Sequence, residues 1–238
     1  DLVVVLQNAP FYLLKMLKIS YITKLKLFSF IRNIFKIFNL HIYYYKKKNY
    51  FKDFNVDNVI DVGVAYGTDF LLKNFPKSNF FLIEPNPFFF NAIEEKIIKK
   101  YNAKLFKIAA GNETNKKKIW YSEGFSSFIQ RDDYKLKKQI EVNTAKLDEI
   151  LKNEKLHGKN LLKIDTEGFE LEVLKGAEKI LDKIDYLVLE IRIENIKTYN
   201  PSEIISHLYN KSFIFYKIIK INYYKNGISY MDAIFLKK

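Results

Sequence analysis

Short apolar runs rich in β-branched residues alternate with helix-type segments from about residue 55 to the end of the chain, and this alternation constrains the fold more than any other feature. A run that is apolar throughout is typical of a strand buried on both faces of a sheet. Strands that alternate with helices indicate an α/β sheet with helices on both of its faces. We expect the main strands at residues 58–63, 79–84, 103–109, 161–165, 186–192, 213–219 and 229–236, shorter strands at 118–122, 127–130 and 139–143, and helices at 68–75, 87–100, 145–152, 169–181 and 202–209.

Several classes of site are excluded by residues that the chain lacks. It has no Cys, so disulfides, cysteine-ligated zinc, iron–sulfur clusters and thiol nucleophiles are ruled out. The three histidines, His41, His157 and His207, are far apart in sequence and form no HExxH pair, so we expect no histidine-rich metal site. Hydrophobic residues make up 48% of the 238 residues, which is enough for a sizeable core.

The positive charge is concentrated at the N-terminus and divides the chain. Residues 1–52 carry ten Lys or Arg and one acid, whereas residues 53–238 carry a net charge of only +4. We therefore expect a basic amphipathic helical extension over residues 1–52 and a separate domain over residues 53–238. Only three of the forty basic residues are Arg, which proteins that read bases and phosphates usually use, so nucleic acid is not the expected partner.

Residues 11–40 are predicted to be helical, because apolar residues are dense there and Gly and Pro are absent. Most of the basic side chains would fall within an arc of about 120°, leaving a wide apolar face. This pattern is typical of a helix in the interface of an anionic membrane, and a run of Tyr and Lys extends it, so residues 11–48 are a candidate membrane-contacting segment. The alternative is a helix that packs its apolar face on the domain. The basic residues of the arc are Lys15, Lys18, Lys26, Arg32 and Lys36.

No secretory signal or membrane-spanning stretch is recognisable, since the longest uncharged apolar run, residues 2–14, is short and interrupted. We therefore expect a cytoplasmic protein, with any membrane contact peripheral and at the inner face. The first residue is Asp rather than Met, so the sequence leaves open whether a preceding segment is missing.

The segment DVGVAYG at residues 61–67 ends the first expected strand and opens a helix. Gly63 and Gly67 let the backbone turn sharply and approach a ligand closely, because they lack a Cβ. The spacing is not GxGxxG, so the pyrophosphate fingerprint of dinucleotide enzymes is absent. Asp61 places a carboxylate beside this turn, which suits a cationic or hydrogen-bond-donating ligand. A tight strand–helix turn without a ligand is the alternative.

Acidic residues follow two further strands, at the edge where open α/β sheets bind ligands. Glu84 can accept hydrogen bonds from both hydroxyls of a ribose; alternatively, it is a solvated strand end or a cap for the next helix. Within KIDTEGFE, the acids Asp165, Glu167 and Glu170 can orient a substrate hydroxyl, act as a general base or hold a divalent cation. The alternative is that Asp165 and Glu167 cap the following helix.

Two charged residues lie on one face of the fifth main strand, Glu190 and Arg192. A carboxylate in a central strand is costly unless it is paired, so we expect these two side chains to pair. A substrate contact by either is the alternative. Ser126 and Ser127 are expected to be loop residues.

Five segments together resemble the FkbM-type family of S-adenosylmethionine-dependent methyltransferases. The family-specific block is LKIDTEGFELEVLKGA, and the resemblance covers about residues 55–238. It implies a class I methyltransferase fold, in which a Rossmann-like, doubly wound sheet of seven strands, the last antiparallel, binds S-adenosylmethionine at the strand carboxyl ends. The segments are 59–68, 83–87, 109–111, 144–151 and 162–177.

The resemblance also implies which residues bind the cofactor. Asp61, Gly63 and Gly67 would line its methionine and ribose, and Glu84 would hold the ribose hydroxyls. The sequence departs from the family at residues 64–66, where members more often have small or polar residues, and Tyr66 would then lie near the methionine part of the cofactor.

Ala109 and Ala110, at the end of the third strand, would lie beside adenine, and Asp165 would sit next to the transferred methyl group. Since a sulfonium already activates that methyl group, the protein mainly has to align the acceptor and remove its proton. We expect Asp165 to be the general base, with Glu167 as its alternate or as a metal partner. The sequence indicates no metal site, although a divalent cation at these acids stays open.

The expected function is O-methylation of a sugar hydroxyl in a polysaccharide, a lipid-linked glycan or a glycosylated metabolite, since the family is associated with such acceptors. One alternative is a non-catalytic cofactor-binding module docked to a membrane or a glycan-assembly complex, which the basic helix and Tyr66 suggest. Another is an RNA methyltransferase, which the positive charge suggests. The sequence names neither the acceptor nor the oligomeric state.

Overall fold

The computed structural model describes residues 2–7, 40–45, 49–122, 125–129, 138–193, 198–224 and 227–238. The chain divides into two compact units, Asp1–Lys52 and Asp53–Lys238. In the first unit, β1 (Leu2–Gln7) and β2 (Leu40–Tyr45) pair in parallel. Within the described residues, we find no helix with the length and apolar character needed to cross a membrane.

Strands lie near both ends of the first unit, where the sequence predicted a helical extension. β1 contains three consecutive valines and β2 an Ile followed by three Tyr, and β-branched and aromatic residues favour strands. Leu40, the last residue of the predicted helix, is in β2, so the prediction is wrong there. Residues 11–39 lie outside the described residues, and their helix stays a prediction.

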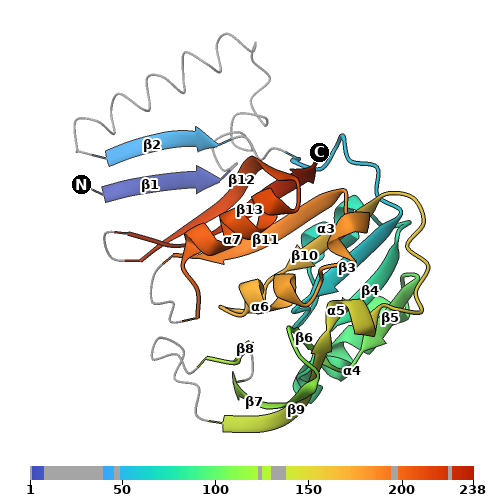
Figure 1. Cartoon of the computed structure of the whole chain (residues 1–238). Helices are drawn as coiled ribbons and strands as arrows, with labels where there is room; N and C mark the ends of the chain where they lie inside the picture. Colours follow the sequence, from blue (N-terminus) through green and yellow to red (C-terminus); the bar gives the residue numbers. More distant parts are fainter. Residues whose placement is uncertain are drawn as a thin grey trace. The chain divides into compact units, whose positions relative to one another are not determined.

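The second unit is built on a seven-stranded sheet with the order β12-β13-β11-β10-β3-β4-β5 (Figure 1). β13 is antiparallel to both of its neighbours, and every other neighbouring pair is parallel. The predicted α/β fold, with seven strands and the last one antiparallel, is therefore confirmed. The strands are β3 (Asn58–Val62), β4 (Asn79–Ile83), β5 (Ala103–Phe106), β10 (Asn160–Ile164), β11 (Tyr186–Arg192), β12 (Phe213–Tyr224) and β13 (Gly227–Lys237).

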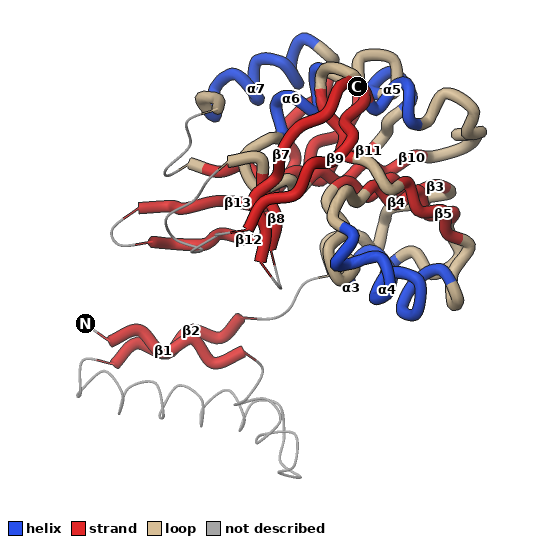
Figure 2. Tube along the Cα trace, turned by 90° about the horizontal axis from the view of Figure 1, so that it is seen from below, coloured by secondary structure: helices blue, strands red, loops and turns tan. Residues whose placement is uncertain are grey.

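Helices cover both faces of this sheet: α3 and α4 lie on one side, and α5, α6 and α7 on the other (Figure 2). The predicted helix at 169–181 is shorter than expected, because it gives way at Gly176. A Cβ at Gly176 would lie 1.8 Å from the carbonyl oxygen of Gly111, so the two backbones touch there. The helices are α3 (Asp69–Asn74), the consecutive turns η1 (Pro87–Phe89), α4 (Phe90–Ile93) and η2 (Glu94–Ile98), then α5 (Leu147–Ile150), α6 (Glu170–Lys175), η4 (Leu181–Lys183) and α7 (Pro201–Asn210).

The chain forms a second sheet of four strands, in the order β6-β9-β7-β8, from the segment that lies between β5 and β10 in the sequence. The prediction of one strand over 103–109 is wrong at its end, because β5 stops at Phe106 and Ala109 belongs to the second sheet, where it pairs with Thr144. Apolar residues stand on both sides of Lys107, so the sequence pattern does not mark the change of sheet. The strands are β6 (Ala109–Gly111), β7 (Asn115–Ser122), β8 (Phe125–Ser127) and β9 (Lys138–Lys146).

Asparagine side chains form a ladder along the amino ends of the central parallel strands. Asn102 donates to Asn79, Asn79 to Asn58 at 2.8 Å, and Asn58 to Asn160 at 2.9 Å. Asn58 also donates to the carbonyl of His157 at 2.7 Å. Asn58 and Asn160 are buried, and buried amides are stable only when their donors and acceptors are satisfied, so the ladder fixes the strands in register.

We expect Asn58→Ala to lower the free energy of unfolding by about 2–3 kcal/mol, because it leaves buried amide groups of the ladder without partners. Urea denaturation measures the change. Asn102→Ala, at the exposed end of the ladder, is the matched control and should cost much less. Equal losses in the two variants would contradict the role of the buried ladder.

Candidate active site

A pocket opens at the carboxyl ends of β3, β4 and β10, where the second sheet faces the first. The apolar part of its lining comes from both sheets, and the acids stand at the strand ends. The position agrees with the rule that open α/β sheets bind ligands at this edge. The lining residues are Val62, Gly63, Ala65, Ile83, Glu84, Pro85, Ala109, Ala110, Ile119, Ser126, Ser127, Phe128, Asp165, Thr166 and Glu167.

Gly63 brings the ends of the three strands together. Its N–H donates to the carbonyl of Ile83 at 3.0 Å, and the N–H of Asp165 donates to the carbonyl of Val62 at 3.0 Å. Gly63 has φ +82°, and a Cβ there would lie only 1.9 Å from the carbonyl oxygen of Asp165. Only glycine combines this backbone angle with so close an approach, which explains its place in the motif.

Glu84 is buried at the end of β4 and faces the pocket. One carboxylate oxygen accepts the N–H of Ala65 at 2.9 Å, and the other accepts the N–H of Asn86 at 2.9 Å. Burial raises the pKa of Glu84 to about 7, against these two hydrogen bonds, which lower it. Each oxygen keeps a second lone pair, so the carboxylate can hold the glycine loop and also receive two ligand hydroxyls.

Lys163 is the central cation of the site, and the sequence analysis missed it. It lies in β10 opposite Asp61 of β3, with its Nζ 3.1 Å from Asp61 Oδ1 and 3.5 Å from Asp165 Oδ2. The ammonium also donates to the carbonyl of Gly63 at 2.9 Å. Burial lowers the pKa of Lys163, but the carboxylates of Asp61 and Asp165 outweigh it and hold that pKa above its usual value. The lysine therefore stays charged although it is buried.

Glu170 shapes the loop that carries Asp165. Its carboxylate accepts the N–H of Thr166 at 2.9 Å and that of Gly168 at 2.9 Å, and the hydroxyl of Tyr199 donates to it at 2.8 Å. The alternative that Asp165 and Glu167 cap the following helix is therefore wrong, because no side chain among the described residues caps α6. Glu170 accepts the N–H groups of the loop, whereas Asp165 and Glu167 line the pocket. Together with the Thr166 hydroxyl, which donates at 3.2 Å, these donors compensate the burial of the Glu170 carboxylate.

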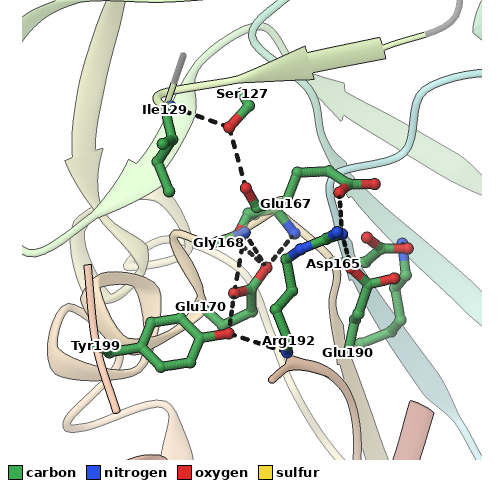
Figure 3. Close-up of polar contacts among 11 residues, drawn as sticks. Ser127, Ile129, Asp165, Glu167, Gly168, Glu170, Glu190, Arg192 and Tyr199 are labelled. Atoms are coloured by element: carbon green, nitrogen blue, oxygen red, sulfur yellow. Dashed lines mark hydrogen bonds and ion pairs between the residues drawn. The ribbon is translucent and has the colours of Figure 1, made fainter. Parts of the chain in front are cut away.

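Arg192 joins two of the remaining acids, as Figure 3 shows. Its Nη1 donates to Glu167 Oε2 at 2.6 Å and to Glu190 Oε1 at 3.0 Å, so the predicted pairing of Glu190 with Arg192 is confirmed. Burial and the neighbouring carboxylates, chiefly that of Asp165, raise the pKa of Glu190 well above its usual range. One oxygen each of Asp165, Glu167 and Glu190 lies within 4.8 Å of the others, which would suit a divalent cation, but Arg192 already neutralises part of this cluster.

The apolar wall of the pocket comes largely from the second sheet. Ala109 and Ala110 line it as expected, although from β6 rather than from the third main strand. Phe128, which follows β8, lines the pocket and packs against Phe169, with the ring centroids 4.4 Å apart and the rings tilted by 40°. Buried Ser127 donates from its hydroxyl to the carbonyl of Glu167 at 3.0 Å, which ties this wall to the loop that carries Asp165 and Glu167. The prediction that Ser126 and Ser127 are loop residues is wrong, because both lie in β8. Two serines in so short a strand carry no pattern that would have revealed this contact.

Three residues of the first motif lie away from the described pocket lining. Asp61 is buried against Lys163. Gly67 has φ +103° and packs near Ile97. Tyr66 is half exposed and meets Phe89 edge-on at 5.0 Å, so it does not narrow the pocket. The structure thus gathers Gly63, Glu84, the two alanines, Asp165 and Glu167 at the pocket, and leaves these three to support the loop.

Residues 61–215 match the family model of the methyltransferase FkbM domain. Among curated proteins, the hexuronic acid methyltransferase AglP of Haloferax volcanii is 28% identical over 138 residues, which are 57% of this chain and 56% of that protein. The chain therefore spans about half the length of this curated relative.

Two solved structures are among those to which the chain is similar. Methyltransferase FkbM from Methylobacillus flagellatus KT is 15% identical, with a TM-score of 0.49 over 76% of this chain and 43% of that chain. Fibrillarin from Aeropyrum pernix, in complex with natively bound S-adenosyl-L-methionine, is 13% identical, with a TM-score of 0.45 over 75% of this chain and 66% of that chain.

We expect Lys163→Met to lower the free energy of unfolding at pH 7 by about 3–5 kcal/mol, because it leaves the buried carboxylate of Asp61 without its cation. Urea denaturation measures the loss. The double variant Asp61→Asn with Lys163→Met should recover part of it, since both partners are then neutral. Lys99→Met, which removes an exposed lysine paired with Glu95, should leave the stability nearly unchanged. A Lys163→Met variant as stable as the native chain would contradict the role of this ion pair.

Proposed function

This chain belongs to the FkbM methyltransferase family, and on that premise we propose that it transfers the methyl group of S-adenosylmethionine to a hydroxyl group of a sugar. The observation that supports the proposal most is the meeting of Gly63, Glu84 and Asp165 at one pocket on the carboxyl edge of the sheet. The acceptor class is supported by the hexuronic acid methyltransferase named among the relatives.

The residues of the pocket fit this cofactor. Glu84 offers a buried carboxylate with spare lone pairs, which suits the two hydroxyls of a ribose. Ala109 and Ala110 give a small apolar wall that suits adenine. Gly63 leaves the backbone uncovered at the strand end, where a ligand can approach closely. When bound, the cofactor supplies a methyl group that its sulfonium has already activated.

Asp165 is proposed as the general base. Its carboxylate lines the pocket, and the exposed fraction of its side chain is 36%, so it can reach an acceptor hydroxyl. The Nζ atom of Lys163 lies 3.5 Å from Asp165 Oδ2, a contact that positions the carboxylate at the pocket. Glu167 is the alternate base, although its ion pair with Arg192 makes it less available. A positioned base contributes about 10²–10⁴-fold in rate, and alignment of the hydroxyl about 7–11 kcal/mol.

The acceptor proposed is a sugar of a polysaccharide, a lipid-linked glycan or a glycosylated metabolite rather than a nucleic acid. The domain over residues 53–238 carries a net charge of only +4, whereas phosphate backbones need a strongly basic surface. Contact of residues 11–48 with an anionic membrane also stays a proposal. A non-catalytic module gains no support from Tyr66, which does not line the described pocket.

We expect Asp165→Asn to reduce methyl transfer at least 100-fold while the affinity for S-adenosylhomocysteine stays within about threefold, because the amide cannot take the acceptor proton. Transfer of labelled methyl groups to a glycan or glycolipid extract, and calorimetric titration of S-adenosylhomocysteine, measure the two quantities. Glu167→Gln is the matched control and should retain more activity. Full activity of Asp165→Asn would remove this residue from the mechanism.

The affinity for S-adenosylhomocysteine should rise between pH 6 and pH 8, up to about tenfold, because Glu84 with a pKa of about 7 loses its proton in this interval. The affinity rises rather than falls with pH because the ribose hydroxyls donate hydrogen bonds, which the ionised carboxylate accepts. Glu84→Gln should bind at least tenfold more weakly at pH 8 and show a flat profile. An unchanged profile in that variant would assign the titration to another group.

A further inference from the structure

The hairpin of β12 and β13 extends beyond the carboxyl edge of the sheet, where the pocket opens. Asp232 of β13 pairs with Glu190, next to the site, and β11 ends two residues later at Arg192, opposite Tyr230. β13 runs three residues further to Gly227, and at about 3.3 Å per residue this overhang is roughly 10 Å long. Both views show the hairpin projecting past the end of β11 (Figures 1 and 2).

Large apolar side chains on this hairpin are exposed. Tyr223 is 67% exposed, Ile221 39% and Ile218 37%, and Ile193, just after β11, is 41% exposed. Ile218 and Ile221 pair with Ala233 and Met231. Nearer the start of β12, Phe215 and Tyr216 are also exposed. Apolar surface gathered on one element in this way marks an interaction site rather than ordinary surface variation.

The charge of the hairpin beyond Asp232 is positive. Residues 213–231 contain three lysines, Lys217, Lys220 and Lys225, and no Asp or Glu, whereas Asp232 lies opposite Lys220. Lys217 and Lys220 alternate with the exposed isoleucines along β12. Aromatic, aliphatic and lysine side chains on one element are the composition of a surface that enters the headgroup region of an anionic bilayer, because the apolar parts are buried while the ammonium groups remain at the phosphates.

The backbone of β12 disfavours a second copy of the chain as the occupant. β12 is an edge strand, and its pairing with β13 shifts register at Phe215/Lys217, Ile218/Lys220 and Asn222/Tyr223. Such bulges, together with lysines on the edge, interrupt the regular row of N–H and C=O groups that strand addition needs. A lipid surface requires no backbone pairing.

We propose that the β12–β13 hairpin docks the protein on an anionic lipid surface, so that the carboxyl edge of the sheet faces the membrane. Together with the proposed function, on which this step rests, such docking implies that the acceptor is a sugar carried on a lipid rather than a soluble metabolite. The hairpin is separate from residues 11–48, and the two surfaces are distinguishable by substitution.

The test is co-sedimentation of the full chain with vesicles of phosphatidylcholine and phosphatidylglycerol at 3:1. The variant Ile221→Ser with Tyr223→Ser should lower the bound fraction at least fivefold. The matched control is Ile205→Ser with Tyr209→Ser on α7, which removes an Ile and a Tyr of similar exposure, 40% and 71%, and should stay within twofold of the native chain. Binding should weaken on pure phosphatidylcholine and at high salt. Melting temperature and S-adenosylhomocysteine binding verify that both variants are folded.

Two outcomes would overturn the proposal. The first is a hairpin variant that binds vesicles as well as the native chain does, or one whose bound fraction falls no more than that of the α7 control variant. The second is a dimer, detected by light scattering without vesicles, that the hairpin variant loses while vesicle binding is unchanged; the patch would then belong to a second copy. Vesicle binding needs no methyl transfer, so a failure of the proposed function would leave hairpin-dependent binding intact.

Discussion

One buried ammonium group holds together the sheet edge at which the pocket opens. Lys163 reaches Asp61 on the neighbouring strand, the carbonyl of Gly63 in the first loop and Asp165 in the loop after its own strand. Lys163 and Asp61 are both buried, and an unpaired charge there would cost several kcal/mol. The geometry of the two loops that meet at the pocket therefore depends on a residue that does not line the pocket itself.

The other acids of the site are compatible with one another because each has its own compensation. Glu170 receives backbone N–H groups and the Tyr199 hydroxyl, and Glu190 shares Arg192 with Glu167. Asp165 differs from them, since its contact with Lys163 is longer, at 3.5 Å, and its side chain is more exposed. This contrast distinguishes an acid that is accessible from the pocket from acids whose oxygens are bound within the protein.

Much of the fold follows from the sequence, because parallel strands buried on both faces have continuous apolar runs that pattern reveals. The site was predictable where a motif has a local cause, as at Gly63, where the backbone angle requires glycine, and at Glu84 and Asp165, which follow strand ends. The role of Lys163 was not predictable, since a lysine inside an apolar strand has no evident function until its partner on another strand is known. The change of sheet at Ala109 and the contact of Ser127 with Glu167 depend in the same way on pairings distant in sequence.

The pocket is walled on one side by a sheet that is a single insertion between β5 and β10. In the described part of the chain its strands pair only with one another, so none of the ladders of the seven-stranded sheet runs through it. Its contacts with the loop after β10 are made by side chains instead, such as the Ser127 hydroxyl on the carbonyl of Glu167 and Phe128 against Phe169. On the proposed function, changes elsewhere in the insertion would reshape the pocket wall and so the choice of acceptor, while the strand ends that carry Gly63, Glu84 and Asp165 keep their ladders.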